Sequence, residues 1–240
     1  MEGTLIGNRS SEIHTSEYEL EDEFVEIIEQ TQGITLVTTS SQNIDRIVTI
    51  FKAAQRCDRM FIIDFYTAEI LEILKKYAKL PNATWPRIRV CYPQFLARQF
   101  EKKGLNDILG RHRKNGIKWD RINEKRDKIV MLIRPGFMFD IKRFVDLNNA
   151  TWIYSMWPGY FEKSQSLQRL KSFLFEQGIK YNYLHTSGHA KLNDLKKFVH
   201  KLSPKTIIPI HSFYPEKFSE LFANVRMLAD GEEINITSCD

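Results

Sequence analysis

Short runs of β-branched and apolar residues alternate with amphipathic stretches along almost the whole sequence. Each run reads as a strand that is buried on both faces. The predicted strands are Ile34–Thr38, Met60–Asp64, Ile88–Cys91, Lys128–Ile133, Thr151–Ser155 and Thr206–Ile210. The predicted helices between them are Glu19–Gln30, Ile44–Gln55, Ala68–Tyr77, Gln94–Lys103, Ser166–Gln177 and Leu192–Leu202. Because parallel neighbours need a crossover helix, this alternation predicts an α/β fold with a mainly parallel sheet flanked by helices.

Several helix ends carry their own signals. Asn43 and Ser164 each precede a predicted helix and suit the N-cap position, where a short polar side chain accepts a backbone N–H. Gly33 and Gly178 follow predicted helices and suit the C-terminal cap, each leading into a strand. These signals place the helix boundaries close to the strands.

The sequence favours a cytoplasmic protein. Cys57, Cys91 and Cys239 are an odd number without CxxC spacing, which predicts isolated reduced thiols. The longest apolar stretches, such as Met60–Phe65 and Ile207–Ile210, are far shorter than the roughly 20 residues of a membrane helix. The first residues also lack a cationic region followed by an apolar run. We therefore expect neither a membrane partner nor secretion.

Positive charge suits a polyanionic partner. The net charge is +5, and Lys102–Lys128 is rich in Lys and Arg, with Trp119 as its sole aromatic ring. This stretch fits either a basic arm that lies along a phosphate backbone or a solvated loop. Charge alone does not decide between them.

Two histidines are the candidate chemical site. His189 stands where a predicted strand gives way to a helix, and His211 follows 22 residues later at the carboxyl end of an apolar run. Ligands of open α/β sheets bind outside the carboxyl ends of the strands, so two histidines at such junctions form a candidate site. Hydrogen-bonded structural histidines are the alternative.

The sequence around these histidines resembles that of a known family. The stretch HTSGHAKLNDLKKFVHKLSPKTIIPIHSFYPEKFSELFANVRMLADGEEI is similar to the end of the β-CASP nucleases of the metallo-β-lactamase superfamily, the group of ribonuclease J and the mRNA 3′-end cleavage factor. Glu2-Gly3-Thr4 resembles the family's first β-CASP motif, and Thr38–Arg46 resembles a strand-loop-helix of ribonuclease J. Trp157-Pro158-Gly159-Tyr160 resembles a further loop near the active site. The resemblance covers essentially the whole chain.

The resemblance implies a role for each matched residue in the catalytic centre. His211 is expected to bind one of two catalytic zinc ions, and His189 to face the leaving group as a proton donor or phosphate contact. Glu2 is expected to orient His189, since a carboxylate on one ring nitrogen fixes the tautomer at the other.

Hydroxyl and amide groups beside helix starts are the candidate phosphate contacts. Ser40, Ser41 and Asn43 suit phosphate, although N-capping explains Asn43 equally well. Ser187 and Gly188 raise the same question. Lys191 stands where ribonuclease J has a small residue, so the expected phosphate pocket departs from that enzyme's.

The resemblance also implies a missing part. The family carries an HxHxDH signature upstream of the Glu-Gly-Thr motif, and none of the six histidines here falls in such a pattern. One histidine cannot assemble the three or four protein ligands of a tight zinc site. We therefore expect no zinc on this chain alone, and an N-terminal metallo-β-lactamase half or partner subunit that completes the site.

The expected organisation has three parts. Residues 1–8 form a strand of the metallo-β-lactamase domain, 9–178 the β-CASP domain, and 179–240 the closing, RNA-specificity segment of the αββα metallo-β-lactamase domain. The predicted function is part of a zinc-dependent phosphodiester hydrolase acting on RNA, with DNA and a homo-oligomer left open. The alternative is a non-catalytic module that binds nucleic acid or complements a partner.

Overall fold

The computed structural model describes residues 1–7, 15–186 and 188–235. The chain forms two compact units, which are described separately. We call residues 15–186 the sheet unit. We call the described residues of 1–14 and 187–240 the terminal unit. Within the described residues, no helix combines the length and the apolar character needed to cross a membrane.

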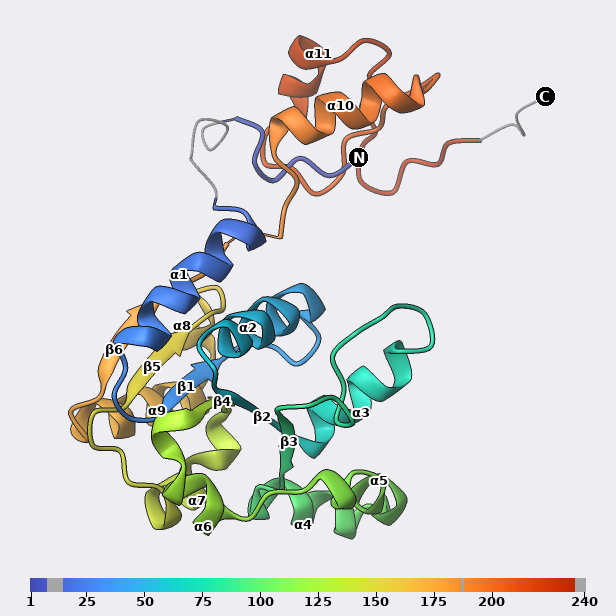
Figure 1. Ribbon diagram of the computed structural model, residues 1–240. Coiled ribbons are helices and arrows are strands. Elements are labelled where there is room, and N and C mark those ends of the chain that lie inside the picture. Colours follow the sequence, from blue (N-terminus) through green and yellow to red (C-terminus); the bar gives the residue numbers. More distant parts are fainter. Residues whose placement is uncertain (8–14, 187, 236–240) are drawn as a thin grey trace. The chain divides into compact units, whose positions relative to one another are not determined.

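The sheet unit contains one six-stranded sheet in which every paired neighbour is parallel (Figure 1). Its strands are β1 (Thr35–Thr38), β2 (Met60–Asp64), β3 (Ile88–Cys91), β4 (Ile129–Leu132), β5 (Thr151–Tyr154) and β6 (Lys180–Tyr183). Their order across the sheet is β3-β2-β4-β1-β5-β6. This confirms the predicted α/β fold with a parallel sheet.

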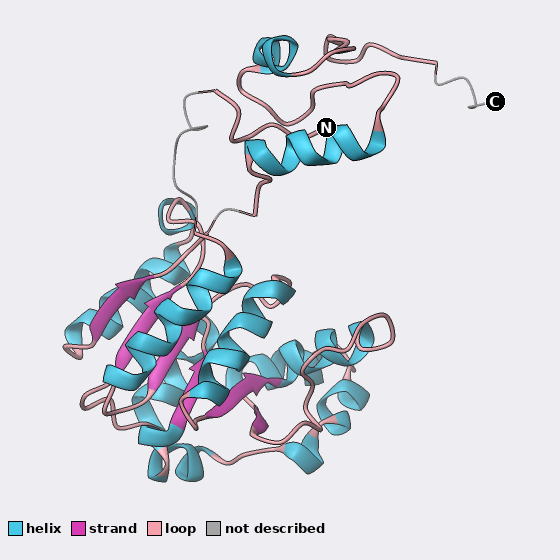
Figure 2. Cartoon of the chain, turned by 45° about the horizontal axis from the view of Figure 1, so that its top comes forward, coloured by secondary structure: helices cyan, strands magenta, loops and turns pink. Residues whose placement is uncertain are grey.

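Helices cover both faces of the sheet (Figure 2). They are α1 (Glu17–Gln30), α2 (Ile44–Arg56), α3 (Phe65–Leu74), α4 (Gln94–Lys102), α5 (Asn106–Arg111), α6 (Trp119–Glu124), α7 (Met138–Phe144), α8 (Tyr160–Lys163) and α9 (Gln165–Glu176). Successive strand residues face opposite sides, so Val37 joins a cluster with α1, α2 and α3, while Leu36 joins one with α6, α7 and α9. Burial on both faces explains why the strands read as continuous apolar runs.

The connections that follow the neighbouring strands β1 and β4 run in opposite directions across the sheet. From β1 the chain passes through α2 to β2, and from the adjacent β4 it passes through α7 to β5. Helix α2 packs on one face of the sheet and α7 on the other. The loops after β1 and β4 therefore diverge at the carboxyl edge, which is the position where open α/β sheets bind ligands.

One predicted strand is wrong. Thr206–Ile210 forms only isolated bridges, between Ile207 and Val225 and between Ile210 and Glu2. Pro209 has no N–H to donate to a ladder, so a continuous strand is not favoured there. The sixth strand of the sheet is instead β6, the strand expected after Gly178.

Three of the four predicted caps are confirmed. Asn43 Oδ1 accepts the N–H of Arg46, and the Ser164 side chain caps α9. Gly178 adopts a φ of +67° directly after α9, a conformation that favours glycine. Gly33 is not a cap. It lies against another loop, where an added Cβ would come within 2.5 Å of the Asn148 carbonyl oxygen.

The basic stretch 102–128 is not a solvated loop. It folds into the short helices α5 and α6, with one 3₁₀ turn between them and another after α6. Arg111 pairs with Glu69 on α3, and the neighbouring His112 is buried with its Nε2 3.1 Å from the other Glu69 oxygen. Trp119 stacks on Phe144. The alternative of a basic arm on a phosphate backbone stays a prediction.

A fully buried arginine ties together both ends of the sheet unit. Arg46 pairs with Glu17 at the start of α1, with 2.8 Å between Nη2 and Oε1. Its other Nη donates to the Ser155 carbonyl oxygen, 3.3 Å away, and to the Ser155 hydroxyl. The Ser155 hydroxyl in turn donates to the Leu184 carbonyl, and the Thr186 hydroxyl donates to the Thr15 carbonyl. The two segments that lead toward the terminal unit are thus fixed to one anchor.

We predict that Arg46→Met destabilises the sheet unit by about 3 kcal/mol, because it leaves Glu17 without its buried cation. The matched control is Arg56→Met on the same helix. Arg56 is exposed and pairs with Glu21 and Asp22, so its loss should cost much less than the loss of Arg46. Urea unfolding measures both. Equal costs for the two variants would contradict the anchoring role of Arg46.

Candidate functional site

Residues 1–3 run beside residues 208–211 in the terminal unit. The N-terminal ammonium donates to the Ile208 carbonyl at 2.6 Å, and the Ile210 N–H donates to the Met1 carbonyl at 2.9 Å. The Gly3 N–H continues the pairing to the His211 carbonyl at 3.4 Å. This short parallel pairing brings Glu2 beside His211, although 209 positions separate them in sequence.

A small apolar core supports this pairing. Ile6, Ile207 and Phe218 pack together with Leu195 of α10 (Leu192–Leu202). Helix α11 (Phe218–Leu221) presents its first ring to Gly3, where an added Cβ would lie 2.4 Å from the Phe218 ring. Gly3 therefore permits the close approach that positions Glu2.

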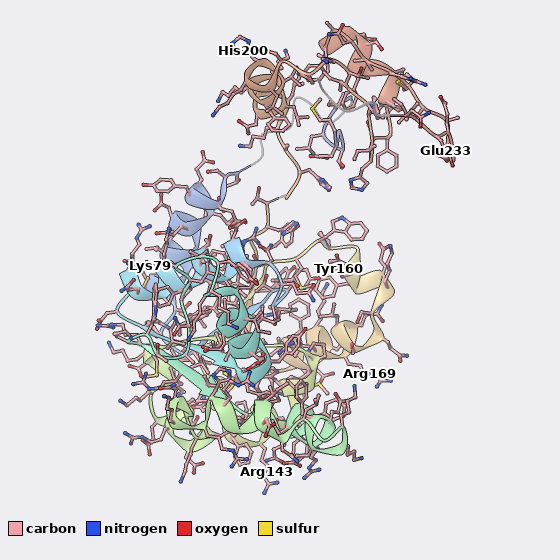
Figure 3. All side chains as sticks on the ribbon, turned by 90° about the vertical axis from the view of Figure 1, so that its right-hand side faces the viewer. Lys79, Arg143, Tyr160, Arg169, His200 and Glu233 are labelled. Carbon is pink, nitrogen blue, oxygen red and sulfur yellow. The ribbon has the colours of Figure 1, made fainter. Side chains whose placement is uncertain are left out.

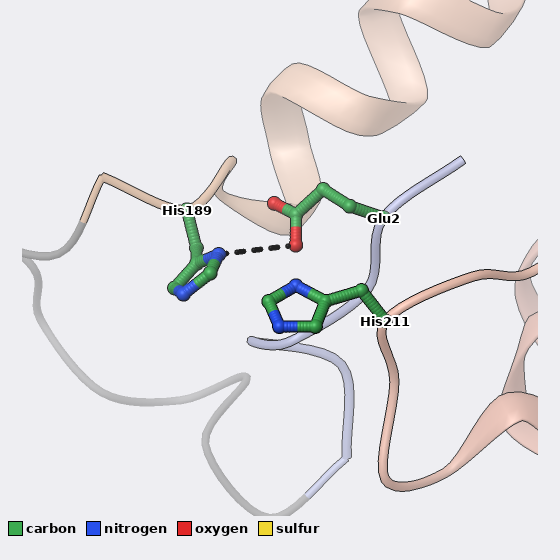
Figure 4. Close-up of side chains that lie close together, drawn as sticks. All are labelled: Glu2, His189 and His211. Atoms are coloured by element: carbon green, nitrogen blue, oxygen red, sulfur yellow. Dashed lines mark ion pairs between the residues drawn. The ribbon is translucent and has the colours of Figure 1, made fainter.

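The Glu2 carboxylate connects three parts of the terminal unit. Its Oε1 accepts the Ala190 N–H at 2.6 Å, and its Oε2 accepts the Thr4 N–H at 3.0 Å. The same Oε2 lies 3.3 Å from His189 Nδ1 (Figure 4). Burial alone raises the pKa of Glu2, but these backbone hydrogen bonds and His189 outweigh it, so the pKa lies below its ordinary value of 4.5. Glu2 is thus held as an anion beside His189.

His211 occupies a left-handed backbone conformation with a φ of +50°. For a residue with a Cβ this costs about 1 kcal/mol and often marks a functional position. The Thr4 hydroxyl donates to the His211 carbonyl at 3.2 Å, and its oxygen also lies 3.2 Å from His211 Nδ1. A hydroxyl that donates to the carbonyl accepts from Nδ1–H, which leaves the lone pair on Nε2.

Glu2, His189 and His211 are the group that the described residues offer to a metal ion. Their ligand atoms all lie within 4.8 Å of one another, and the two imidazole rings are 5.2 Å apart between centroids. Imidazole nitrogen and carboxylate oxygen are normal zinc ligands. Both Glu2 oxygens already accept backbone hydrogen bonds, so the carboxylate is not free to give both oxygens to a metal.

The remaining predicted residues lie in different places. In the sheet unit, Ser40, Ser41 and Asn43 follow β1. Ser41 is buried with its Oγ 2.8 Å from Thr67 Oγ1, while Ser40 Oγ accepts the Gln42 N–H at 3.2 Å. Asn43 caps α2, so its side-chain oxygen already has a partner. Gly188 is in the terminal unit with open space around its Cα, and Ser187 lies outside the described residues.

A cavity of about 400 Å³ opens at the carboxyl edge between β1 and β4. Its lining comes from the loops after β1, β4 and β5 and from the start of α9, and includes Ser40, Ser41, Ser164, Ser166 and Arg134. We call it the switch-point cavity, since it lies where the chain leaves β1 and β4 in opposite directions.

Sequence reasoning missed Arg134. It lies two residues after the end of β4, pairs with the buried Asp64 at the end of β2, and lies over the Tyr66 ring at 5.0 Å. An arginine placed just after a buried strand was the available signal. With the serine hydroxyls, its guanidinium gives the cavity the groups that bind phosphate.

We predict that the pH dependence of unfolding reports Glu2. Its lowered pKa means that its contribution to stability is complete above the ordinary value of 4.5 and is lost as the pH falls through the lower folded pKa. Thermal unfolding of wild type and Glu2→Gln should therefore differ above pH 4.5 and converge in more acidic buffer. A difference that grows on acidification would contradict the charged, hydrogen-bonded Glu2.

Comparison with known proteins gives a family match to part of the chain and a likeness in fold. Residues 179–224 match a family described as "Zn-dependent metallo-hydrolase RNA specificity domain". Both His189 and His211 lie inside this match, which points to a zinc-dependent metallo-hydrolase family with RNA specificity and supports the resemblance to metallo-β-lactamase proteins. No significant match was found among curated proteins.

Among solved structures, the chain resembles a protein of unknown function from Enterococcus faecalis V583, with a TM-score of 0.62 and 17% identity. At this identity the likeness concerns the fold alone. The match covers 98% of this chain and 50% of that one, so this chain spans half the length of the matched protein.

Proposed function

We propose that this chain is part of a zinc-dependent phosphodiester hydrolase that acts on RNA, of the β-CASP, ribonuclease J-like type. The observation that carries the proposal is the cluster of Glu2, His189 and His211, whose ligand atoms lie within 4.8 Å of one another. Both histidines belong to the stretch that matches the RNA specificity domain of zinc-dependent metallo-hydrolases.

His211 is the proposed zinc ligand. Thr4 acts behind it, because its oxygen beside Nδ1 leaves Nε2 available for the metal. Zinc in such a site lowers the pKa of bound water and stabilises charge on a phosphoryl oxygen. The left-handed conformation of His211 fits a side chain whose direction is set by function rather than by local backbone preference.

His189 is the proposed proton donor or phosphate contact at the leaving group. Glu2 Oε2 pairs with its Nδ1 and orients the ring toward the proposed role of Nε2 at the leaving group. The lowered pKa of Glu2 keeps its carboxylate charged beside His189 Nδ1. Glu2 is therefore a positioning residue that acts through His189.

Phosphate groups of the substrate are proposed to bind at two places. One is the switch-point cavity, where Ser40, Ser41 and Arg134 supply hydroxyl and guanidinium groups. Asn43 supports that site by starting α2, whose N-terminus favours anions. The other is the loop at Ser187 and Gly188, next to His189 in sequence.

A further polypeptide part is proposed to complete the enzyme. The sequence offers no HxHxDH pattern, and the Glu2 cluster supplies at most three ligands. Large apolar side chains of the terminal unit are exposed, notably Phe198, Leu202, Ile210 and Phe213. Exposed apolar groups of this kind suit a protein interface. We assign residues 1–8 and 179–240 to a metallo-β-lactamase domain and 9–178 to the β-CASP domain.

The second candidate is a non-catalytic module that binds nucleic acid or complements a partner. The absence of the HxHxDH signature from the sequence favours it, because a catalytic zinc needs three protein ligands. Under this reading the switch-point cavity still binds phosphate, but no polypeptide added to the chain creates cleavage.

We predict zinc-dependent RNA cleavage after the chain is combined with a polypeptide that carries the HxHxDH segment of a full-length relative. In the complex, His189→Ala should lower the cleavage rate on the order of 10²-fold or more, the contribution of a general acid. The control is His200→Ala, an exposed histidine on α10 (Figure 3). Gel-based cleavage of a labelled RNA, with and without a zinc chelator, gives the rates.

A folded complex without cleavage, shown by gel filtration and circular dichroism, would overturn the nuclease proposal and favour the binding module. Equal rates in His189→Ala and His200→Ala would show that His189 has no part in the chemistry.

A further inference from the structure

Two large aromatic side chains extend into solvent from residues 156–164, the loop after β5 together with the short helix α8. Trp157 is 50% exposed and Tyr160, labelled in Figure 3, is 45% exposed. Their rings meet edge to face, with centroids 5.5 Å apart and planes at 86°. Neither ring belongs to a core cluster of the described residues. Packing of the fold therefore does not explain why this loop carries them.

The loop holds Trp157 in a fixed position. An added Cβ on Gly159 would lie 2.2 Å from the indole, so the ring rests directly against this glycine. The Trp157 carbonyl accepts the Tyr160 N–H at 3.2 Å and the Tyr154 hydroxyl at 3.3 Å. The exposed ring is thus ordered before any ligand binds, which lowers the entropy cost of binding.

The surroundings favour an anionic ligand with flat rings. Lys163 Nζ lies 5.3 Å from the Trp157 ring centroid. The loop starts and ends at the switch-point cavity, because Met156 on one side and Ser164 on the other both line it. Arg134, which pairs with the buried Asp64, lines the same cavity, and no acidic side chain is among the lining residues. An aromatic surface thus adjoins a site with the chemistry for phosphate.

We propose that Trp157 and Tyr160 form a stacking platform for a nucleobase of single-stranded RNA, with a neighbouring phosphate in the switch-point cavity. Bases of a single strand offer open faces for stacking, whereas bases of a duplex are already stacked on one another. Lys163 adds charge beside the base. This inference rests on the proposed function and names its substrate form as single-stranded.

The test is direct binding of labelled oligouridylate to the full chain, followed by fluorescence anisotropy. Trp157→Ala removes the platform, and Trp157→Phe keeps an aromatic ring. Tyr77→Ala is the matched control, since Tyr77 is an 83% exposed aromatic residue of the sheet unit away from this loop. An oligomer of the same length with abasic sugars separates base stacking from phosphate binding. Circular dichroism checks that each variant is folded.

Trp157→Ala should weaken oligouridylate binding on the order of 10-fold, as expected for loss of one stacked base. Trp157→Phe should restore most of the affinity, and neither change should affect the abasic oligomer. The platform is overturned if Trp157→Ala binds oligouridylate as tightly as Tyr77→Ala, or if it weakens the abasic oligomer equally. A surface for a protein partner would give the first of these results.

These outcomes are separate from those for the nuclease. If Trp157→Ala leaves oligouridylate binding unchanged while the reconstituted complex cleaves RNA in a zinc-dependent way, the platform proposal is rejected and the nuclease proposal stands. Base-dependent binding through Trp157 without any cleavage would keep the platform and leave the non-catalytic module as the function.

Discussion

The pairing of residues 1–3 with residues 208–211 determines the candidate site. It consists of a few backbone hydrogen bonds, and it places Glu2 beside His211 while Thr4 reaches the His211 ring. The carboxylate then links this pair to the loop that carries His189 through the Ala190 N–H. Three chain segments far apart in sequence thus converge on one carboxylate. Its charge is kept by hydrogen bonds that outweigh the effect of burial on its pKa.

The sheet unit adds a second site by a different physical route. Its strand order forces the chain to leave β1 and β4 toward opposite faces, and the loops that diverge there line the switch-point cavity. Arg134 brings a guanidinium into this cavity, and the loop after β5 carries the exposed Trp157 next to Met156, which lines the cavity. The topology supplies the cavity, and the loop residues supply its chemistry.

The sequence predicted those features that depend on local patterns. Five of the six predicted strands and the start of α2 at Asn43 follow from apolar runs and capping chemistry. The proposed roles of the histidines came from a resemblance of short motifs. The run Thr206–Ile210 misled because an apolar pattern does not reveal whether a partner strand is present. The position of Arg134 in the cavity was not predicted, because it depends on the strand order that places β4 beside β1.

The position of Glu2 next to both histidines is the feature that no local pattern contains. This position results from pairing between distant segments of the chain. The family resemblance suggested it, and the structure gives the contacts of Glu2. The central proposal is that His211, and not His189, is the zinc ligand. Thr4 on one ring and Glu2 on the other give the two imidazoles different partners, and hence different chemistry.

X-ray absorption at the zinc edge, recorded on the complex with the HxHxDH-bearing polypeptide, tests this claim most directly. The account predicts that His211→Ala removes one imidazole from the zinc coordination shell, while His189→Ala leaves the shell unchanged. Loss of an imidazole in His189→Ala, or an unchanged shell in His211→Ala, would contradict it.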